Sequence, residues 1–288
     1  MGMVEWVIPV AAMGYAIVAT SASLSVGVPG FLIALIAVAP LALAALALER
    51  VYPERDEYSA PDQPLRTEVA HYLFDYNAGY AISIAGCAAL QRALGDRSGW
   101  LGWPSSWPVV LQVALAGVLA EATSYWQHRL VHRVPWLWRF HALHHQGQRL
   151  NVFRTGRFHF IDIAPGAFLS FAPLVLLRAP ESMSVWVVTL SGALGVLEHA
   201  NVRMRTPRWL DFIVCTPAVH RHHHSRDARE SGSNFGTVTM LFDILFGTYQ
   251  RPRPAGPLAV GVEEAPLNGG FWRQLLSPFR PTRASDVG

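Results

Sequence analysis

The stretch "WQHRLVHRVPWLWRFHALHHQ", residues 126–146, holds five histidines directly after an apolar run long enough to cross a bilayer. His128 and His132 form an HxxxH pair, and residues four apart on a helix lie on one face, one turn apart. His141, His144 and His145 follow as HxxHH, a spacing that again places three imidazoles on one helix face. The stretch therefore predicts helices that present histidine clusters at the end of a membrane span.

Further along the chain the same spacing returns in "HRHHHS", residues 220–225, which holds a second HxxHH. Single histidines stand between the two clusters in "RFHFID" and "EHANV". His71 and His222 are interpreted as non-ligands, and a helix-packing hydrogen bond between His71 and Asp75 is expected. The ten candidate metal ligands are His128, His132, His141, His144, His145, His159, His199, His220, His223 and His224.

Ten imidazoles indicate more than one metal ion. Neutral imidazole suits iron, zinc, copper and nickel, and two six-coordinate ions would take ten nitrogens and leave open positions. A structural zinc site would use about four ligands and usually includes cysteine, whereas Cys87 and Cys215 are far apart and form no CxxC. This pattern favours an oxygen-activating di-iron site.

Composition indicates a membrane protein, because 51% of the residues are hydrophobic and only 15% are charged. A membrane helix needs about 20 mostly apolar residues. The sequence therefore predicts an all-α, polytopic membrane helical bundle of about four to six spans or half-spans, with a cytoplasmic-face histidine-rich helical cap. The expected spans are residues 4–27, 31–48, 69–90 and 109–126, and the shorter apolar stretches are residues 161–177 and 185–197.

Arginine placement predicts the orientation. All 23 cationic residues are arginine, and 20 of them fall in the 49–67 linker, the 129–157 region or the part after residue 200. Cytoplasmic loops carry the excess of positive charge, so both histidine clusters are expected on the cytoplasmic face. Arginine at membrane ends also explains the basic character without a nucleic-acid partner. The Arg-only, Ala-rich composition favours a bacterial plasma membrane.

Three units are expected along the chain. Residues 1–106 would form N-terminal transmembrane helices and loops, and residues 107–250 would form the metal-binding domain with the histidine motifs. Residues 251–288 are rich in proline and glycine and predict an irregular tail, with a short helix at "GFWRQLLSPF", residues 270–279.

Five stretches together resemble the fatty acid hydroxylase/sterol desaturase superfamily, over roughly residues 115–250. They are "EATSYWQHRLVHRVPWLWRFHALHH", "RFHFID", "EHANV", "CTPAVHRHHHS" and "NFGTVTMLFDILFGTY". Members are membrane di-iron enzymes with an all-histidine site, so the resemblance implies that the HxxxH pair and both HxxHH sets bind the metals. It further implies oxidation of a C–H bond by O2 in a lipophilic substrate that enters from the lipid bilayer: a fatty acyl chain, sterol, carotenoid or ether lipid.

Three carboxylates are expected to support these ligands. A ligating imidazole needs its other ring N–H held, usually by a carboxylate or carbonyl, to fix the tautomer and the ring angle. Glu121 lies two turns before His128, where the family commonly has Asp. Asp162 follows His159 by about one turn, and Asp243 follows the last cluster.

Lipid hydroxylation is the expected activity, and three other activities are alternatives to it. Desaturation by the same superfamily stays an alternative, because the two outcomes diverge only after the first hydrogen is lost. An intramembrane zinc protease would need HExxH, whereas Arg129, Leu130 and Val131 separate the histidines here. A metal transporter would place its ligands within the spans. Because no flavin or nicotinamide fingerprint is evident, electrons are expected from a separate ferredoxin- or cytochrome b5-like carrier.

Overall fold

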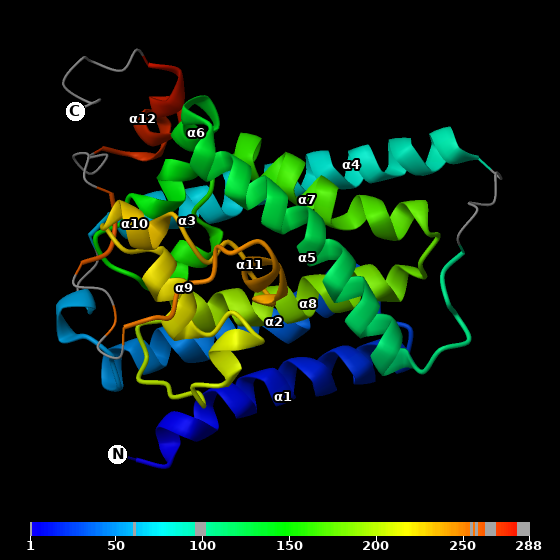
Figure 1. The fold of residues 1–288 in the computed structure, drawn as a ribbon, viewed down its shortest axis with the longest axis horizontal. Helices are drawn as coiled ribbons and strands as arrows, with labels where there is room; N and C mark the ends of the chain where they lie inside the picture. The colour runs from blue at the N-terminus through cyan, green and yellow to red at the C-terminus, as the bar shows by residue number, and fades with distance from the viewer. Residues whose placement is uncertain are drawn as a thin grey trace.

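The computed structural model describes residues 2–59, 62–95, 102–253, 256, 259–262 and 269–280. Apart from isolated β-bridges, the regular structure of these residues is helical, which confirms the predicted fold class. The long helices run side by side, and most of the short ones gather at one end of the bundle (Figure 1). The long helices are α1 (Val4–Ser25), α2 (Gly30–Val51), α4 (Asn77–Leu94), α5 (Val109–Arg133), α7 (Phe160–Leu176) and α8 (Glu181–His199).

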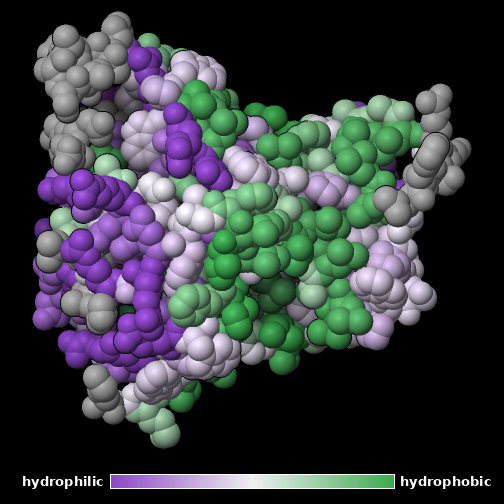
Figure 2. Space-filling view, viewed as in Figure 1, coloured by the Kyte–Doolittle hydropathy of each residue, from purple (hydrophilic) through white to green (hydrophobic). Residues whose placement is uncertain are grey.

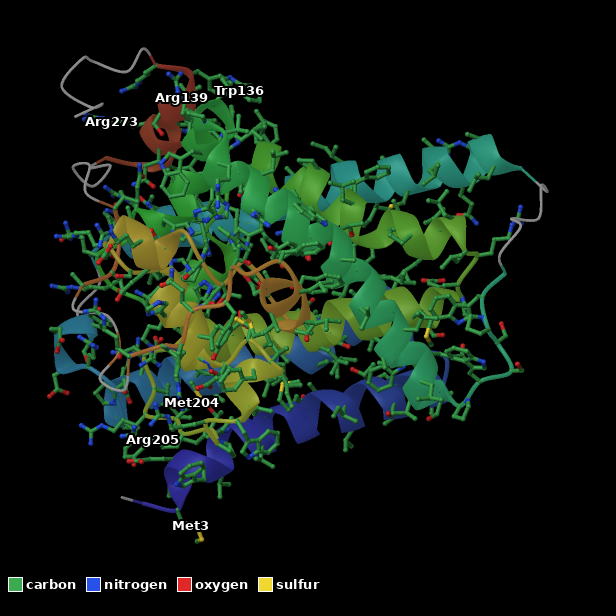
Figure 3. The ribbon with its side chains drawn as sticks, in the orientation of Figure 1. Met3, Trp136, Arg139, Met204, Arg205 and Arg273 are labelled. Atoms are coloured by element: carbon green, nitrogen blue, oxygen red, sulfur yellow. The ribbon has the colours of Figure 1, made fainter. Side chains whose placement is uncertain are left out.

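The short elements build a cap whose surface is mostly hydrophilic except in the region of α11, while the neighbouring bundle is mostly hydrophobic (Figure 2). Arg139, Arg205 and Arg273 lie at this end of the molecule (Figure 3). The cap elements include α6 (Pro135–His145), η3 (Val152–Gly156), η4 (Leu210–Phe212), α9 (Pro217–His223), α10 (Ala228–Ser231), α11 (Leu241–Leu245), α12 (Phe271–Leu275) and η5 (Ser277–Phe279). The other short elements are η1 (Asp56–Tyr58), α3 (Leu65–Ala70) and the π-helix η2 (His71–Tyr76).

Within the described residues, three helices are long and apolar enough to cross a membrane: α1, α2 and α5. They correspond to the first, second and fourth predicted spans. The third predicted stretch, residues 69–90, forms the end of α3, η2 and most of α4, a helical run that falls outside this set. The two shorter stretches form α7 and α8, whose depth in a membrane stays a prediction.

The third stretch changes its helical pitch at η2. The extra residue of a π-turn leaves main-chain carbonyls without their usual helical donors. Here the Asn77 side-chain amide donates to the carbonyls of Tyr72 and Leu73, at 2.8 and 3.2 Å. The His71 ring bonds Asp75 at 2.6 Å, as expected from their spacing, and its second nitrogen lies 2.9 Å from the Gln274 side chain.

Small residues let the helices of the bundle approach closely, as membrane helices commonly do. A Cβ added at Gly79 of α4 would lie 2.4 Å from Ile163 of α7, and one added at Gly192 of α8 would lie 3.1 Å from Val38 of α2. Because both contacts join residues 1–106 to residues 107–250, the two expected units pack directly. The three-part division itself stays a prediction.

A buried ion pair fastens the C-terminal segment to the cap. Arg157 donates to the Glu68 carboxylate at 2.8 Å and to the Gln274 side-chain carbonyl at 2.8 Å. Gln274 belongs to α12, which lies in the stretch expected to hold a short helix. The tail after residue 251 is therefore ordered over α12 and η5, while residues 254–255, 257–258, 263–268 and 281–288 lie outside the described residues.

The close approach at Gly79 predicts a stability difference between two glycine-to-alanine changes. Gly79→Ala should destabilise the fold by about 1–3 kcal/mol through overpacking against Ile163. Gly14→Ala in α1 is the control, because an added Cβ there meets nothing within 4 Å. Thermal unfolding in detergent measures both, and an equal melting temperature for the two variants would contradict the close α4–α7 contact.

Candidate metal centre

Four helices deliver the histidines to one buried region of the cap end. His128 and His132 lie on the last turns of α5, and His199 ends α8. Pro135 at the first turn starts α6, and Pro217 starts α9 behind Thr216, whose hydroxyl accepts from the Val219 N–H. Proline suits a first helical turn because its missing N–H is not needed there. The helical spacing then turns each motif toward the interior, as the sequence predicts.

The structure brings nine of the ten candidate histidines together in two groups, within each of which the donor nitrogens lie no more than 4.8 Å apart. Group 1 consists of His128, His132, His141, His145 and His223. Group 2 consists of His144, His199, His220 and His224. Each HxxHH motif contributes to both groups, so the two groups are neighbours that share α6 and α9.

Hydrogen bonds on the far side of the rings fix which nitrogen faces the centre of group 1. The Nδ1–H of His128 donates to the Phe235 carbonyl at 2.7 Å, and the Nδ1–H of His223 donates to the Ser233 carbonyl at 2.7 Å. A neutral imidazole carries only one N–H, so the Nε2 atoms of both rings carry lone pairs. These two Nε2 atoms lie 3.1 Å apart. Two lone pairs at that distance repel each other unless a cation lies between them.

Group 2 repeats this arrangement. The Nδ1–H of His199 donates to the Gly195 carbonyl at 2.8 Å, which leaves a lone pair on its Nε2. That atom lies 3.3 Å from Nε2 of His144 and 3.0 Å from Nε2 of His220. Nε2 of His224 lies 3.0 Å from Nε2 of His220.

These separations fit metal binding. Two nitrogens bound to one ion at about 2.1 Å lie about 3.0–3.4 Å apart in octahedral or tetrahedral geometry. In group 1, Nε2 of His132 is buried without a hydrogen-bond partner, which a metal ion would supply. The donor set is entirely imidazole, which suits iron, zinc, copper or nickel. Both groups therefore have the geometry and the chemistry to hold one ion each.

Burial keeps the cap histidines in the neutral form that binds metal. Burial, reinforced by neighbouring imidazoles, lowers the pKa of His144 and His145 well below the usual 6.5. The same two causes lower the pKa of His220, His223 and His224 in and after α9. These five imidazoles are consequently uncharged at neutral pH.

Asp162 bonds the candidate ligand His141 of α6, and not His159, which it follows by about one turn. Its carboxylate accepts from Nδ1–H of His141 at 2.8 Å and from the Gln127 side-chain amide at 3.1 Å. The first bond leaves Nε2 of His141 for the centre of group 1, where it lies 3.2 Å from Nε2 of His145. Asp162 thus fixes the ring of a residue from a different helix.

Glu121 and Asp243 make other contacts than expected, since both bind the loop of residues 233–239 and neither bonds an imidazole. Glu121 accepts from the N–H groups of Thr237 and Val238 at 2.7 and 3.1 Å. Asp243 accepts from those of Phe235 and Gly236 at 2.8 and 2.7 Å. The same loop presents the carbonyls that hold His128 and His223, so the two carboxylates orient the ligands through the main chain.

His159 is the candidate ligand that the structure leaves outside both groups, which corrects the expectation from the sequence. Its Nδ1 accepts from the Ile161 N–H at 3.1 Å, as the cap of α7, and its Nε2–H donates to the Leu275 carbonyl at 3.1 Å. Both ring nitrogens are therefore used in joining α7 to the end of α12. His222, interpreted as a non-ligand, also lies outside both groups.

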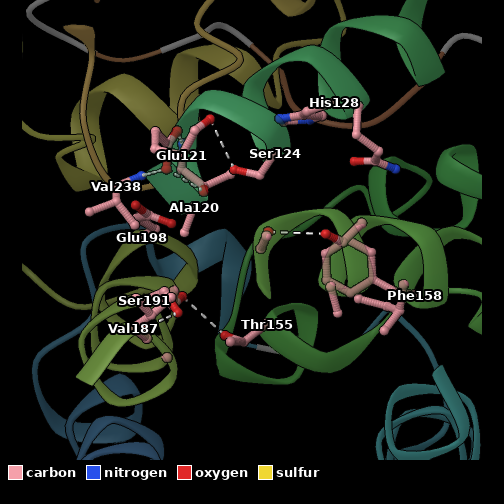
Figure 4. Close-up of a pocket in the computed structure, with 18 of the residues that line it drawn as sticks. Ala120, Glu121, Ser124, His128, Thr155, Phe158, Val187, Ser191, Glu198 and Val238 are labelled. Carbon is pink, nitrogen blue, oxygen red and sulfur yellow. Dashed lines mark hydrogen bonds between the residues drawn. The ribbon is translucent and has the colours of Figure 1, made fainter. Parts of the chain in front are cut away.

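A cavity of about 260 Å³ connects the histidines with the helical bundle. Its walls come mainly from α5, α7 and α8 and include Val113, Phe171 and Leu190. Figure 4 shows Glu121, Ser124 and His128 of α5 across an open space from Val187 and Ser191 of α8. The candidate ligands that line the cavity are His128, His141, His144, His199 and His220. A long apolar molecule could thus reach both groups from the bundle.

Several residues that shape the site could not be identified from the sequence. The carbonyls of Ser233, Phe235 and Gly195 hold three rings, but a main-chain acceptor has no residue type that marks it. Gly236 shows the local constraint, because an added Cβ would lie 2.4 Å from the Thr239 carbonyl and 2.9 Å from the Asp243 carboxylate. The "NFG" stretch, residues 234–236, was the one feature of the sequence that pointed to a constrained loop before α11.

The comparisons with known proteins agree with this geometry. The profile of the fatty acid hydroxylase family matches residues 113–248. Ornithine lipid hydroxylase OlsE of Rhizobium tropici is 37% identical over 248 residues, covering 83% of this chain and 74% of that protein. Alkylglycerol monooxygenase of Homo sapiens is 30% identical over 152 residues, covering 52% of this chain and 32% of that protein. The chain therefore spans about a third of the latter's length. No solved structure matches the chain.

Adjacent histidines of α9 provide a matched test of the metal groups. His223→Ala should lower the amount of bound metal, because it removes a candidate ligand of group 1 and its hydrogen bond to the Ser233 carbonyl. His222→Ala should keep the full metal content, since this ring lies outside both groups. Elemental analysis of the purified proteins measures the difference. Equal metal content in both variants would contradict the assignment of His223.

Acid should destabilise the metal-free protein. The cap histidines have a folded-state pKa below the unfolded value of 6.5, so the unfolded chain binds more protons as pH falls through that value. The free energy of unfolding then decreases from about pH 6.5 downward. Thermal unfolding of chelator-treated protein in nanodiscs, at neutral and mildly acidic pH, measures the effect. A melting temperature that rises on acidification would contradict neutral, buried imidazoles.

Proposed function

We propose that this chain, which belongs to the fatty acid hydroxylase family, is a membrane-bound oxygenase that hydroxylates a C–H bond of a lipid. The observation that carries the proposal is the pair of imidazole groups with converging lone pairs at the end of a largely apolar cavity. The family profile and the hydroxylase and monooxygenase relatives support the same oxidoreductase chemistry.

The metals proposed for the two groups are iron ions. Group 1 would hold one ion through His128, His132, His141, His145 and His223, and group 2 the other through His144, His199, His220 and His224. When bound, the two ions supply the activation of O2 that a C–H bond requires. Group 2 offers one nitrogen fewer than group 1, which leaves more of its coordination sphere for an exogenous ligand.

The chain's own residues bind the substrate and exclude water. Val113, Phe171 and Leu190 give the cavity an apolar wall on which an alkyl chain packs. The five ligand rings that border the cavity then limit which carbon atoms come close to the metals. Burial of all the group 2 histidines keeps bulk water away from the reacting carbon, which protects a reactive oxidant from side reactions.

The proposed substrate is an acyl chain of a polar membrane lipid. The alignment with ornithine lipid hydroxylase OlsE covers 83% of this chain and 74% of that protein, which favours an ornithine lipid. Alkylglycerol monooxygenase aligns over about half of this chain and supports an ether lipid as the second candidate. A substrate held in the bilayer would reach the cavity laterally, between the helices that form its walls.

The electron supply and the location are proposed as well. A hydroxylation that reduces O2 needs two electrons from outside, and we assign them to a separate ferredoxin- or cytochrome b5-like carrier. The arginines of the cap support a cytoplasmic position for the metal groups, because positive charge accumulates on that side. The relative from Rhizobium supports a bacterial plasma membrane as the location.

The test is lipid profiling of a bacterial host that makes ornithine lipids, with and without this chain. The expected product is a lipid that gains one oxygen atom, and growth under isotopically labelled O2 should transfer the label into it. His223→Ala should abolish the product, whereas His222→Ala should retain it. Loss of two hydrogen atoms without oxygen gain would indicate desaturation instead. Iron-loaded protein that changes no host lipid would contradict the proposal.

A further inference from the structure

Two short elements of the cap, η4 and α11, bury their acidic side chains and expose their apolar ones. η4 reads Leu-Asp-Phe and α11 reads Leu-Phe-Asp-Ile-Leu. In each element the one acidic residue, Asp211 or Asp243, is buried, while apolar neighbours are exposed. A surface element in water normally places its charges outward and its apolar residues inward.

The exposed apolar side chains form one patch, which we call the α11 patch. Its members are between 40% and 66% exposed. They are Trp209, Phe212, Ile213, Leu241, Ile244, Leu245 and Phe246. The two segments are joined at Ile213, whose carbonyl accepts from the Met240 N–H at 3.1 Å and from the Thr239 hydroxyl at 2.7 Å.

Hydrogen bonds of the two buried aspartates hold α11 and η4 in this orientation. Asp243 accepts from Phe235, Gly236 and Thr248, and Asp211 accepts from the Thr216 hydroxyl at 2.7 Å. Rotating α11 to bury Leu245 would remove Asp243 from the loop that holds the candidate ligands. The exposed apolar surface is therefore a fixed feature of the fold and requires an apolar neighbour.

The α11 patch is continuous with the exposed face of α5, one of the helices long and apolar enough to cross a membrane. The Phe246 ring lies 4.8 Å from the ring of Trp126, which is half exposed on α5, and Leu130 is exposed one turn further. The Arg129 guanidinium lies 5.4 Å from the centroid of the Trp126 ring. Trp and Arg together mark the headgroup level of a membrane helix.

The space-filling view agrees with this continuity. In Figure 2 the hydrophobic surface extends from the bundle over the region of α11 and ends at the hydrophilic cap. Exposed Arg208 precedes Trp209 at the border of the patch, where its charge can pair with lipid phosphates. The chemistry around the patch thus changes from apolar to cationic, as the boundary of one leaflet does.

We propose that the α11 patch is a lipid-contact surface that inserts into the leaflet reached by the metal end of α5. α11 and η4 would lie in the membrane plane, with their apolar residues among the upper acyl chains, as interfacial helices do. Through Asp243, this contact sets the depth of the 233–239 loop and hence of the metal groups. The inference rests on the membrane-spanning helices and is independent of the proposed oxidation chemistry.

Depth-dependent fluorescence quenching of the metal-loaded, full-length protein in phosphatidylcholine nanodiscs tests the proposal. Cys87→Ala removes the half-buried cysteine, and Cys215 is fully buried. An environment-sensitive label is then attached at Leu245→Cys, or at Leu241→Cys should the first variant not fold. Arg229→Cys, exposed on α10, is the control. Metal content verifies the fold of each labelled variant.

Spin labels on the lipid acyl chains should quench the α11 label several-fold more than the label on α10. Weak and equal quenching at both positions would overturn the proposal. The proposal also fails if the α11 label is shielded from water only in discs that hold two chains, because the patch would then cover a second copy. All of these outcomes can be read without measuring lipid hydroxylation.

Discussion

Hydrogen bonds on the far side of the imidazole rings determine what the cap can bind. A ring whose Nδ1–H donates to a carbonyl or carboxylate must direct the lone pair of Nε2 the other way. His128, His223 and His199 are all held in this manner, by Phe235, Ser233 and Gly195. The helices then bring Nε2 of His128 to 3.1 Å from Nε2 of His223, and Nε2 of His199 to 3.3 Å from Nε2 of His144. Each group of nitrogens therefore favours a cation between its members.

The loop of residues 233–239 connects the hydrogen bonds that orient the rings with α5 and α11. Glu121 reaches it from α5 and Asp243 from α11, and the two carboxylates bind the main-chain N–H groups of residues 235–238, next to the carbonyls that hold the rings. α5 therefore supplies two ligands, a support for the loop that orients them and part of the cavity wall. A single helix long and apolar enough to cross a membrane thus contributes both to the cavity wall and to group 1.

The helical motifs could be predicted from the sequence because their geometry is local. HxxxH and HxxHH place their rings on one face of a helix whatever the tertiary structure, and the structure brings all eight of these histidines into the groups. His159 shows the limit, because its role depends on capping α7 and on a contact with Leu275, 116 residues away. The loop contacts of Glu121 were hidden for the same reason, since Thr237 is distant in sequence. The third apolar stretch stays a predicted span, and its π-turn, accompanied by the polar contacts of His71, Asp75 and Asn77, could not be predicted from apolar length alone.

The central claim is that two neighbouring ions are held by imidazole nitrogen alone, and iron K-edge X-ray absorption of the purified protein tests it most directly. The spectrum should show nitrogen scatterers with the outer-shell pattern of imidazole rings, a second iron nearby and no sulfur neighbour. A sulfur shell would contradict this arrangement, because it would come from a side chain such as Cys215, whose Sγ lies 3.9 Å from Nδ1 of His220. The absence of an iron–iron contribution in fully loaded protein would contradict it as well.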